Sequence, residues 1–326
     1  MSTQMHKIGR NSNIDKIKGL LIFLVVFGHF LEKYMGWHGD LSSSLLKFIY
    51  AIHMPAFIFI SGMFFNIEKW KESSYRYFSI FLAFQFLYII FDYIVNGGDV
   101  SRWLSTPYWI MWFMFTLSIY CLITPILIRQ KQVLFISVCL AIYIGLVETD
   151  NYPYSIGRTL SFLPFFILGV LYGKKIYSAL FEKWYAVIIS IAVLIALGIA
   201  SYFIDMQPSW LFGVANINDY YDSVVFGIFI KISLLATSIL SILSVMRLSK
   251  VLPSFFEIFG KRSLSIYLFH GFVVILSSKY VYFSQPDCLM LIVCFVLSLA
   301  TCIILKEQFF GRVIARLSKP IMKIFK

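Results

Sequence analysis

Three histidines lie inside long apolar segments of the sequence, where an ionisable ring is costly to bury. His29 falls in the run GLLIFLVVFGHFLEKY, His53 in KFIYAIHMPAFIFISGMFF and His270 in KRSLSIYLFHGFVV. Histidine titrates near neutral pH, so it can take or give a proton under physiological conditions. One buried histidine can be structural when it bonds to a neighbouring helix, whereas three predict a shared polar cavity capable of acid–base chemistry.

The first apolar segment places Asp15, Lys18 and His29 on one face of a helix. Lys18 and His29 are eleven residues apart, which is about 1100° of rotation and about 16 Å of rise. His29 is therefore expected near mid-membrane, and a direct bond to Lys18 along the helix is excluded. As a pair three residues apart, Asp15 and Lys18 taken by themselves are better explained as ordinary interfacial charges.

The composition identifies the environment of these residues. The chain has 326 residues, of which 60% are hydrophobic and 13% charged, and its mean hydropathy is +0.83. Soluble domains carry about a quarter charged residues. The sequence therefore predicts an all-α, polytopic membrane protein, organised as a single domain over 1–326, because a spanning helix needs about 20 apolar residues.

Hydropathy along the chain predicts about ten transmembrane helices. They are expected at about 17–34, 46–65, 77–95, 107–128, 133–148, 160–174, 184–204, 223–246, 264–280 and 287–305. Gly, Pro, Asn and Asp collect in the interruptions, as they do in turns. Residues 1–16 and the basic segment 307–326 are predicted as terminal tails.

The distribution of basic residues predicts that both termini are cytoplasmic. With the N-terminus inside, Lys231 lies within a span, and the external segments hold only Lys33, Lys47, Arg102, Arg158 and Lys279. All other Lys and Arg fall on the cytoplasmic side, as the positive-inside rule requires. The net charge of +12 is thus explained by topology, and nucleic-acid binding is not expected because no soluble domain remains to carry it.

A few further side chains are candidates for binding. Arg158 precedes a span on the side where positive charge is scarce, so it either snorkels or holds an anion or a sugar oxygen. Trp112 is a candidate as well, although an aromatic belt at the membrane interface is its simplest explanation. Arg76 and Arg262 could attract a polyanion, although the positive-inside rule already accounts for them. The five cysteines form no C-x-x-C pair, and no disulfide or metal site is predicted.

An ordered set of motifs resembles the acyltransferase-3 family of membrane acyltransferases, in particular its fucose 4-O-acetylase group. The matching pieces are IDKIKGLLIFLVVFGHF, IHMPAFIFISGMFF, WFMFTLSIY, GRTLSFLPFFILG and SLSIYLFHGFV. The most specific is a basic residue followed by ten positions and then histidine, here Lys18 and His29. The pieces follow the family's order over nearly the whole chain.

The resemblance implies transfer of an acyl group, usually acetyl, from cytoplasmic acetyl-CoA to a hydroxyl of a carbohydrate, such as a capsular, exopolysaccharide or lipid-linked glycan. His29 is expected to act as general base or acyl carrier, with Asp15 and Lys18 orienting it or closing the cytoplasmic mouth. Lys18 would contact the donor's phosphates, with Arg76 and Arg262 as further candidates. The expected acceptor-side residues are His53, which also joins the catalytic candidates, Arg158, Trp112 and His270.

Two other classes of function remain open at this stage. A glycan transporter or flippase could use the same histidines as a proton relay or a sugar path, although no inverted repeat or matched pair of broken helices is evident. A membrane subunit that scaffolds a glycan-biosynthesis complex would tolerate substitution of every polar residue named above. The resemblance implies the cytoplasmic membrane, in contact with its lipids, and leaves the oligomeric state open.

Overall fold

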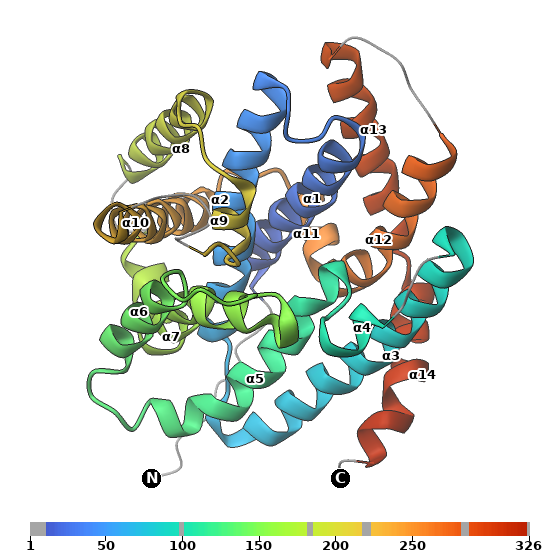
Figure 1. The fold of residues 1–326 in the computed structure, drawn as a ribbon, viewed down its shortest axis with the longest axis horizontal. Coiled ribbons are helices and arrows are strands. Elements are labelled where there is room, and N and C mark those ends of the chain that lie inside the picture. Colours follow the sequence, from blue (N-terminus) through green and yellow to red (C-terminus); the bar gives the residue numbers. More distant parts are fainter. Residues whose placement is uncertain (1–10, 98–100, 181–184, 217–222, 282–286, 325–326) are drawn as a thin grey trace.

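The computed structural model describes residues 11–97, 101–180, 185–216, 223–281 and 287–324, and within these ranges it contains helices and no strand. The helices form a bundle with α1 at its centre (Figure 1). In chain order they are α1 Ser12–Tyr34, α2 Asp40–Met63, η1 Ile67–Lys69, α3 Trp70–Asn96, α4 Arg102–Ser105, η2 Trp109–Met111, α5 Trp112–Leu127, α6 Val133–Tyr143, η3 Pro153–Ser155, α7 Ile156–Ala179, α8 Ala186–Phe203, α9 Pro208–Phe212, α10 Val224–Leu248, α11 Phe255–Lys261, α12 Ser263–Tyr280, α13 Asp287–Leu305 and α14 Gln308–Ile324.

The all-helical, multi-pass architecture is confirmed. Seven helical stretches of the described chain are long and apolar enough to cross a membrane, and α11 with α12, which meet at 84°, can form an eighth, bent span. Each of the ten predicted segments contains a helix. However, α1 carries charges near both ends, and α6 has only 11 residues, shorter than its predicted 133–148. The count of ten spans and the side on which the termini lie stay predictions.

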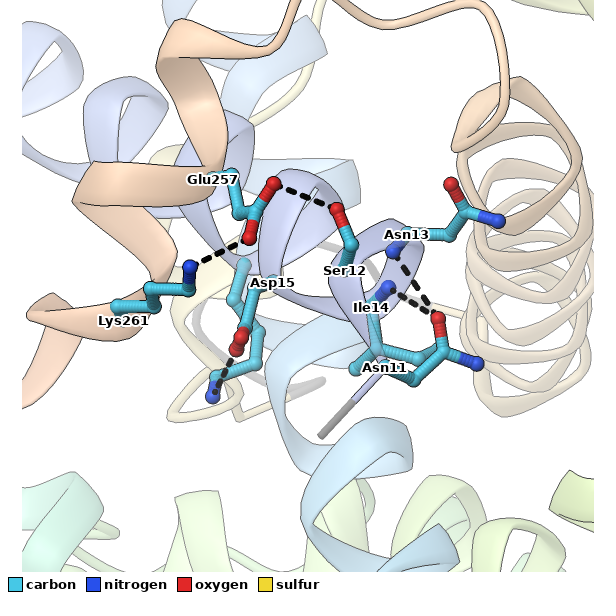
Figure 2. Close-up of polar contacts among 8 residues, drawn as sticks. Asn11, Ser12, Asn13, Ile14, Asp15, Glu257 and Lys261 are labelled. Atoms are coloured by element: carbon cyan, nitrogen blue, oxygen red, sulfur yellow. Dashed lines mark hydrogen bonds and ion pairs between the residues drawn. The ribbon is translucent and has the colours of Figure 1, made fainter. Parts of the chain in front are cut away.

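The start of α1 is fastened by a cap and by a contact to α11 (Figure 2). The Asn11 side chain accepts hydrogen bonds from the Asn13 and Ile14 backbone N–H groups, so α1 begins earlier than the sequence analysis predicts. The Ser12 hydroxyl donates to Glu257 at 2.5 Å, and Lys261 pairs with the same carboxylate at 2.5 Å. Residues 1–10 of the predicted N-terminal tail lie outside the described residues.

Glycines bring α1 into backbone contact with α11. A Cβ added to Gly19 would lie 1.8 Å from the Phe256 carbonyl oxygen, and one added to Gly260 would lie 1.7 Å from the Asp15 carbonyl oxygen. Small residues allow such close approach between membrane helices. The two glycines therefore fix the crossing point that positions the first half of α1.

A second glycine pair joins α2 to α7. A Cβ on Gly62 would lie 2.2 Å from the Phe166 carbonyl oxygen, and one on Gly169 would lie 2.2 Å from the Phe59 carbonyl oxygen. Both glycines therefore lie where the α2 and α7 backbones are in contact. Two glycine crossings consequently hold α1 and α2, the helices that carry His29 and His53.

The basic segment after the last predicted span forms the amphipathic helix α14, which packs against α3 and α12. Ile314 is buried on the packed side, whereas four basic side chains are exposed, Arg312, Arg316, Lys319 and Lys323. The positions of these four repeat at helical spacing, so they form one stripe. Lys and Arg on the polar face are typical of helices that lie at a membrane surface.

We expect Gly19→Ala to destabilise the bundle because its methyl group cannot fit against the α11 backbone. The cost should be at least about 1–3 kcal/mol, as for other overpacked interiors. Gly198→Ala in α8 is the matched control, since its Cβ would meet nothing closer than 4.0 Å. Thermal unfolding in detergent, followed by loss of monodisperse protein, measures both variants. Equal melting temperatures would contradict the close approach of α1 and α11.

Candidate active site

Two cavities lie among the helices that carry the candidate residues. The larger, of about 470 Å³, is here called the histidine cavity and is lined by polar, charged and aromatic side chains that include His29, Glu32, Lys33, Tyr50, His53, Asp92, Arg102, Trp103, Tyr108, Trp109, Trp112, Tyr152, Arg158 and Lys279. The smaller, of about 250 Å³, is called the lysine cavity. It is lined mostly by apolar side chains, together with Lys18 and Arg76.

Three side chains, here called the wall, lie where the two cavities adjoin. They are Val25, Met54 and Tyr267, which line both cavities. The Tyr267 hydroxyl donates a hydrogen bond to the Ile110 carbonyl, and its ring packs edge-on against Phe113 at 5.4 Å. These contacts hold the Tyr267 ring in place. The two cavities therefore adjoin at these three side chains.

One face of α1 runs past both cavities. Lys18, Ile22 and Val25 line the lysine cavity, while Val25, His29 and Glu32 line the histidine cavity. The spacing of four, three, four and three residues keeps these side chains on a single stripe of the helix. The shared face predicted for Lys18 and His29 is confirmed, and so is their separation, because each lines a different cavity.

His29 forms a hydrogen-bonded cluster with Glu32 and Tyr50. The Tyr50 hydroxyl donates to Glu32 Oε2 at 2.7 Å. Nδ1 of His29 lies 3.2 Å from the Tyr50 oxygen and 3.4 Å from Glu32 Oε2. Because the single hydroxyl proton of Tyr50 goes to Glu32, Nδ1 must be the donor in both of its contacts. Nε2 of neutral His29 is then left with a lone pair, as a general base requires.

The other two predicted histidines are held by backbone carbonyl groups. His53 Nδ1 donates to the Ile49 oxygen at 2.7 Å, and His270 Nδ1 donates to the Tyr267 oxygen at 2.7 Å. His53 lines the histidine cavity. His270 is fully buried and does not line it, but its ring stacks on that of His29 at 5.3 Å. The predicted clustering of the three histidines is therefore found, with His270 behind His29.

Aromatic rings and cations share the rest of the histidine cavity. The Trp109 ring lies 4.5 Å from that of His29, between centroids. The Arg158 guanidinium lies 5.3 Å from the centre of the Trp112 ring and 5.2 Å from that of Tyr152. Cation–π contacts of this kind hold a guanidinium in a defined orientation. Arg158 and Trp112, predicted as acceptor-side residues, thus occupy the same cavity as His29.

The lysine cavity combines an apolar lining with charge at its rim. Phe57, Ile60 and Phe113 are among the side chains that line it. Lys18 Nζ lies 3.3 Å from Asp15 Oδ1, and both side chains belong to the first turns of α1. Such a cavity suits a ligand with an apolar or extended arm and an anionic head.

Two predicted site residues, one catalytic and one donor-binding, lie outside both cavities. Arg262 is in the break between α11 and α12, near Gly311 of α14, and lines neither cavity. Asp15 also lines neither, although it bonds to Lys18. Within the described residues, no group of three or more His, Cys, Asp or Glu is arranged to hold a metal ion.

The sequence analysis missed the partners of His29. Glu32 is three residues after His29, so helical spacing could have identified it as a neighbour on the same face. Tyr50 comes from α2, and no feature of the sequence distinguishes it from the other 19 tyrosines of the chain. The wall residue Tyr267 was likewise unrecognised, because its role depends on the relative positions of three helices.

A family model described as an acyltransferase domain, of the acyltransferase-3 family, matches residues 11–307. No curated protein and no solved structure matches the chain.

We expect His29 to carry its proton on Nδ1 when the ring is neutral. Nitrogen NMR of protein labelled in histidine should show a protonated Nδ1 and an unprotonated Nε2 for the signal that disappears in His29→Asn. In Glu32→Ala, loss of the carboxylate acceptor should change this signal more than that of His38, an exposed histidine in the following loop. A protonated Nε2 in the wild-type protein would contradict the hydrogen-bonding pattern described above.

Proposed function

Because the chain belongs to the acyltransferase-3 family, we propose that it transfers acetyl from acetyl-CoA to a hydroxyl of a carbohydrate, in the manner of fucose 4-O-acetylases. The observation that carries the proposal is the meeting of two cavities at Val25, Met54 and Tyr267. Val25 precedes His29 by about one helical turn, or about 6 Å. A donor in the lysine cavity and an acceptor in the histidine cavity would bring thioester and hydroxyl together beside His29.

His29 is the proposed general base. Its Nε2 removes the proton from the acceptor hydroxyl as that oxygen attacks the carbonyl carbon of the thioester. The carbon–sulfur bond then breaks, an ester forms, and the proton passes to the CoA thiolate, so the products are acetylated carbohydrate and free CoA. Glu32 and Tyr50 hold Nδ1–H and stabilise the imidazolium between the two proton transfers, as the buried carboxylate of a catalytic triad does.

Transfer through an acetyl group on His29 would use the same nitrogen. Nε2 would then attack the thioester, and the acceptor hydroxyl would attack the resulting acetyl-imidazole. This route differs from direct transfer in leaving acetyl label on the protein when the acceptor is withheld.

The lysine cavity is the proposed donor site. Lys18 and Arg76 are the cations in its lining, and a CoA ester carries phosphates at one end of a long arm. Cations at the rim would hold these phosphates, while the apolar lining accepts the arm and the acetyl group. The excess of basic residues at this end of the bundle supports a cytoplasmic position for it, in the cytoplasmic membrane, with both termini on the same side.

We expect His29→Asn to abolish acetyl transfer without preventing insertion. Loss of a general base should lower the transfer rate by about 10²–10⁴-fold. Radiolabelled acetyl-CoA, supplied to protein in liposomes with a panel of glycans, measures label on the glycan. His38→Asn, which replaces the exposed loop histidine near the same end of α1, is the matched control and should transfer normally.

Two results would count against this function. Transfer at the wild-type rate by inserted His29→Asn protein would exclude His29 as the base. Movement of a lipid-linked glycan across the bilayer, with no label transferred by the wild type, would favour the transporter. In that case the wall between the cavities would be a gate.

Lys18→Gln should weaken donor binding more than it slows the chemical step. Loss of one charge-assisted hydrogen bond to a phosphate should raise KM for acetyl-CoA about tenfold, with a smaller change in kcat. Lys175→Gln is the matched control, because Lys175 is exposed on the last turns of α7 and does not line the lysine cavity. Steady-state kinetics with varied acetyl-CoA tests both variants, and an unchanged KM in Lys18→Gln would remove Lys18 from the donor site.

A further inference from the structure

Positive charge gathers in the histidine cavity although its end of the bundle is otherwise poor in basic residues. The five basic residues predicted to be external are at the end that holds the loop between α1 and α2. Four of them line the histidine cavity, namely Lys33, Arg102, Arg158 and Lys279. The fifth, Lys47, lies outside it and donates to the Ile204 carbonyl at 2.7 Å. The positive-inside rule explains the scarcity of these residues but not their concentration in one cavity.

Rings and backbone groups contact the four cations, of which Lys33, Arg102 and Lys279 are also exposed. Lys33 lies over Trp109, and Arg102 lies over Trp103 and Tyr152. Lys279 contacts the Val95 carbonyl and the Asn96 side chain. Among the described residues, no carboxylate lies within 4.0 Å of any of the four cationic groups, so no ion pair neutralises them there.

The two carboxylates in the cavity lining are already used as acceptors. Glu32 accepts from Tyr50 and contacts His29. Asp92 accepts from the Tyr108 hydroxyl at 2.9 Å and from the Asn96 amide at 2.6 Å. Among the described residues of the lining, four cations therefore face two acids that are engaged with neutral or histidine partners, which leaves an excess of positive charge there.

We propose that the acceptor is an anionic carbohydrate, whose carboxylate or phosphate is held by Arg158 and the neighbouring cations while its hydroxyl faces His29. This inference rests on the proposed acetyl transfer and specifies its substrate class. Arg158 suits the task because a guanidinium binds a carboxylate or phosphate through two parallel hydrogen bonds. Trp112 and Tyr152 already orient it, so little side-chain freedom is lost on binding.

The size and lining of the histidine cavity indicate that the anionic group belongs to the acceptor molecule itself. Arg158 and His29 line one cavity of about 470 Å³, which accommodates a small ligand but keeps both groups within reach of it. Aromatic rings beside both groups, Trp112 and Trp109, offer apolar faces for the ring of a sugar. An anion bound at Arg158 would thus fix which hydroxyl of the same molecule reaches His29.

The test compares matched pairs of ligands that differ only in charge. One pair is an oligogalacturonide and the same oligosaccharide after reduction of its carboxyl groups. The other is an oligosaccharide 1-phosphate and its dephosphorylated form. Binding is measured by thermophoresis of the full protein in phosphatidylcholine nanodiscs, which contain no anionic lipid, at low and high salt.

We expect at least one anionic member to bind about tenfold more tightly than its neutral partner, with the difference reduced at high salt. Preference within the first pair identifies a carboxylate, and preference within the second identifies a phosphate. Arg158→Gln should remove most of the preference. Lys47→Gln, which neutralises the basic residue outside the cavity, should leave it unchanged.

Three outcomes would overturn the inference. The first is that neither anionic ligand binds more tightly than its neutral partner, and the second is that Lys47→Gln reduces the preference as much as Arg158→Gln. The third is that phosphatidylglycerol, included in a second nanodisc preparation, displaces the anionic sugars and binds in their place. Failure of the proposed acetyl transfer would give a different result from failure of the anion site. Charge-selective binding without acetyl transfer would reject the transferase and keep the anion site, whereas equal transfer to neutral and anionic glycans would reject the anion site and keep the transferase.

Discussion

The structure depends on giving the His29 ring hydrogen-bond partners within an apolar helix. An imidazole buried without partners would be costly, and α1 alone offers His29 only the Glu32 carboxylate one turn away. Tyr50 completes the cluster by donating to Glu32 and accepting from His29, which joins α1 to α2. The same bonds that make the histidine tolerable also leave its Nε2 as the basic nitrogen. Stability and the chemistry proposed here thus impose the same geometry.

The two glycine crossings make this geometry possible. Gly19 and Gly260 bring α1 against α11, and Gly62 with Gly169 brings α2 against α7. Because α1 and α2 are held at these points, their polar stripes can line two cavities that share a wall of only three side chains. Under the proposed function, donor and acceptor would each occupy one cavity, and only the acetyl group would pass between them.

The basic residues near the two cavities have different explanations. Basic residues are abundant near the lysine cavity, and membrane topology accounts for them. The histidine cavity holds four of the few cations at its end of the bundle, together with aromatic rings that face them. An excess of positive charge that topology does not require is evidence for a ligand. For this reason the electrostatics of the site support the proposed anionic acceptor more than they support the proposed donor.

The sequence by itself determined that this is a helical membrane protein, because runs of apolar residues long enough to cross a bilayer are a local property of the chain. Helical spacing also determined that Lys18 and His29 share a face, and the motifs identified the family. Only the tertiary structure decided that Tyr50 completes the His29 cluster, that Arg262 lies away from the lysine cavity, and that Tyr267 is part of the wall. These facts arise from the relative positions of separate helices, and side-chain packing between them leaves no periodic signal in any one segment.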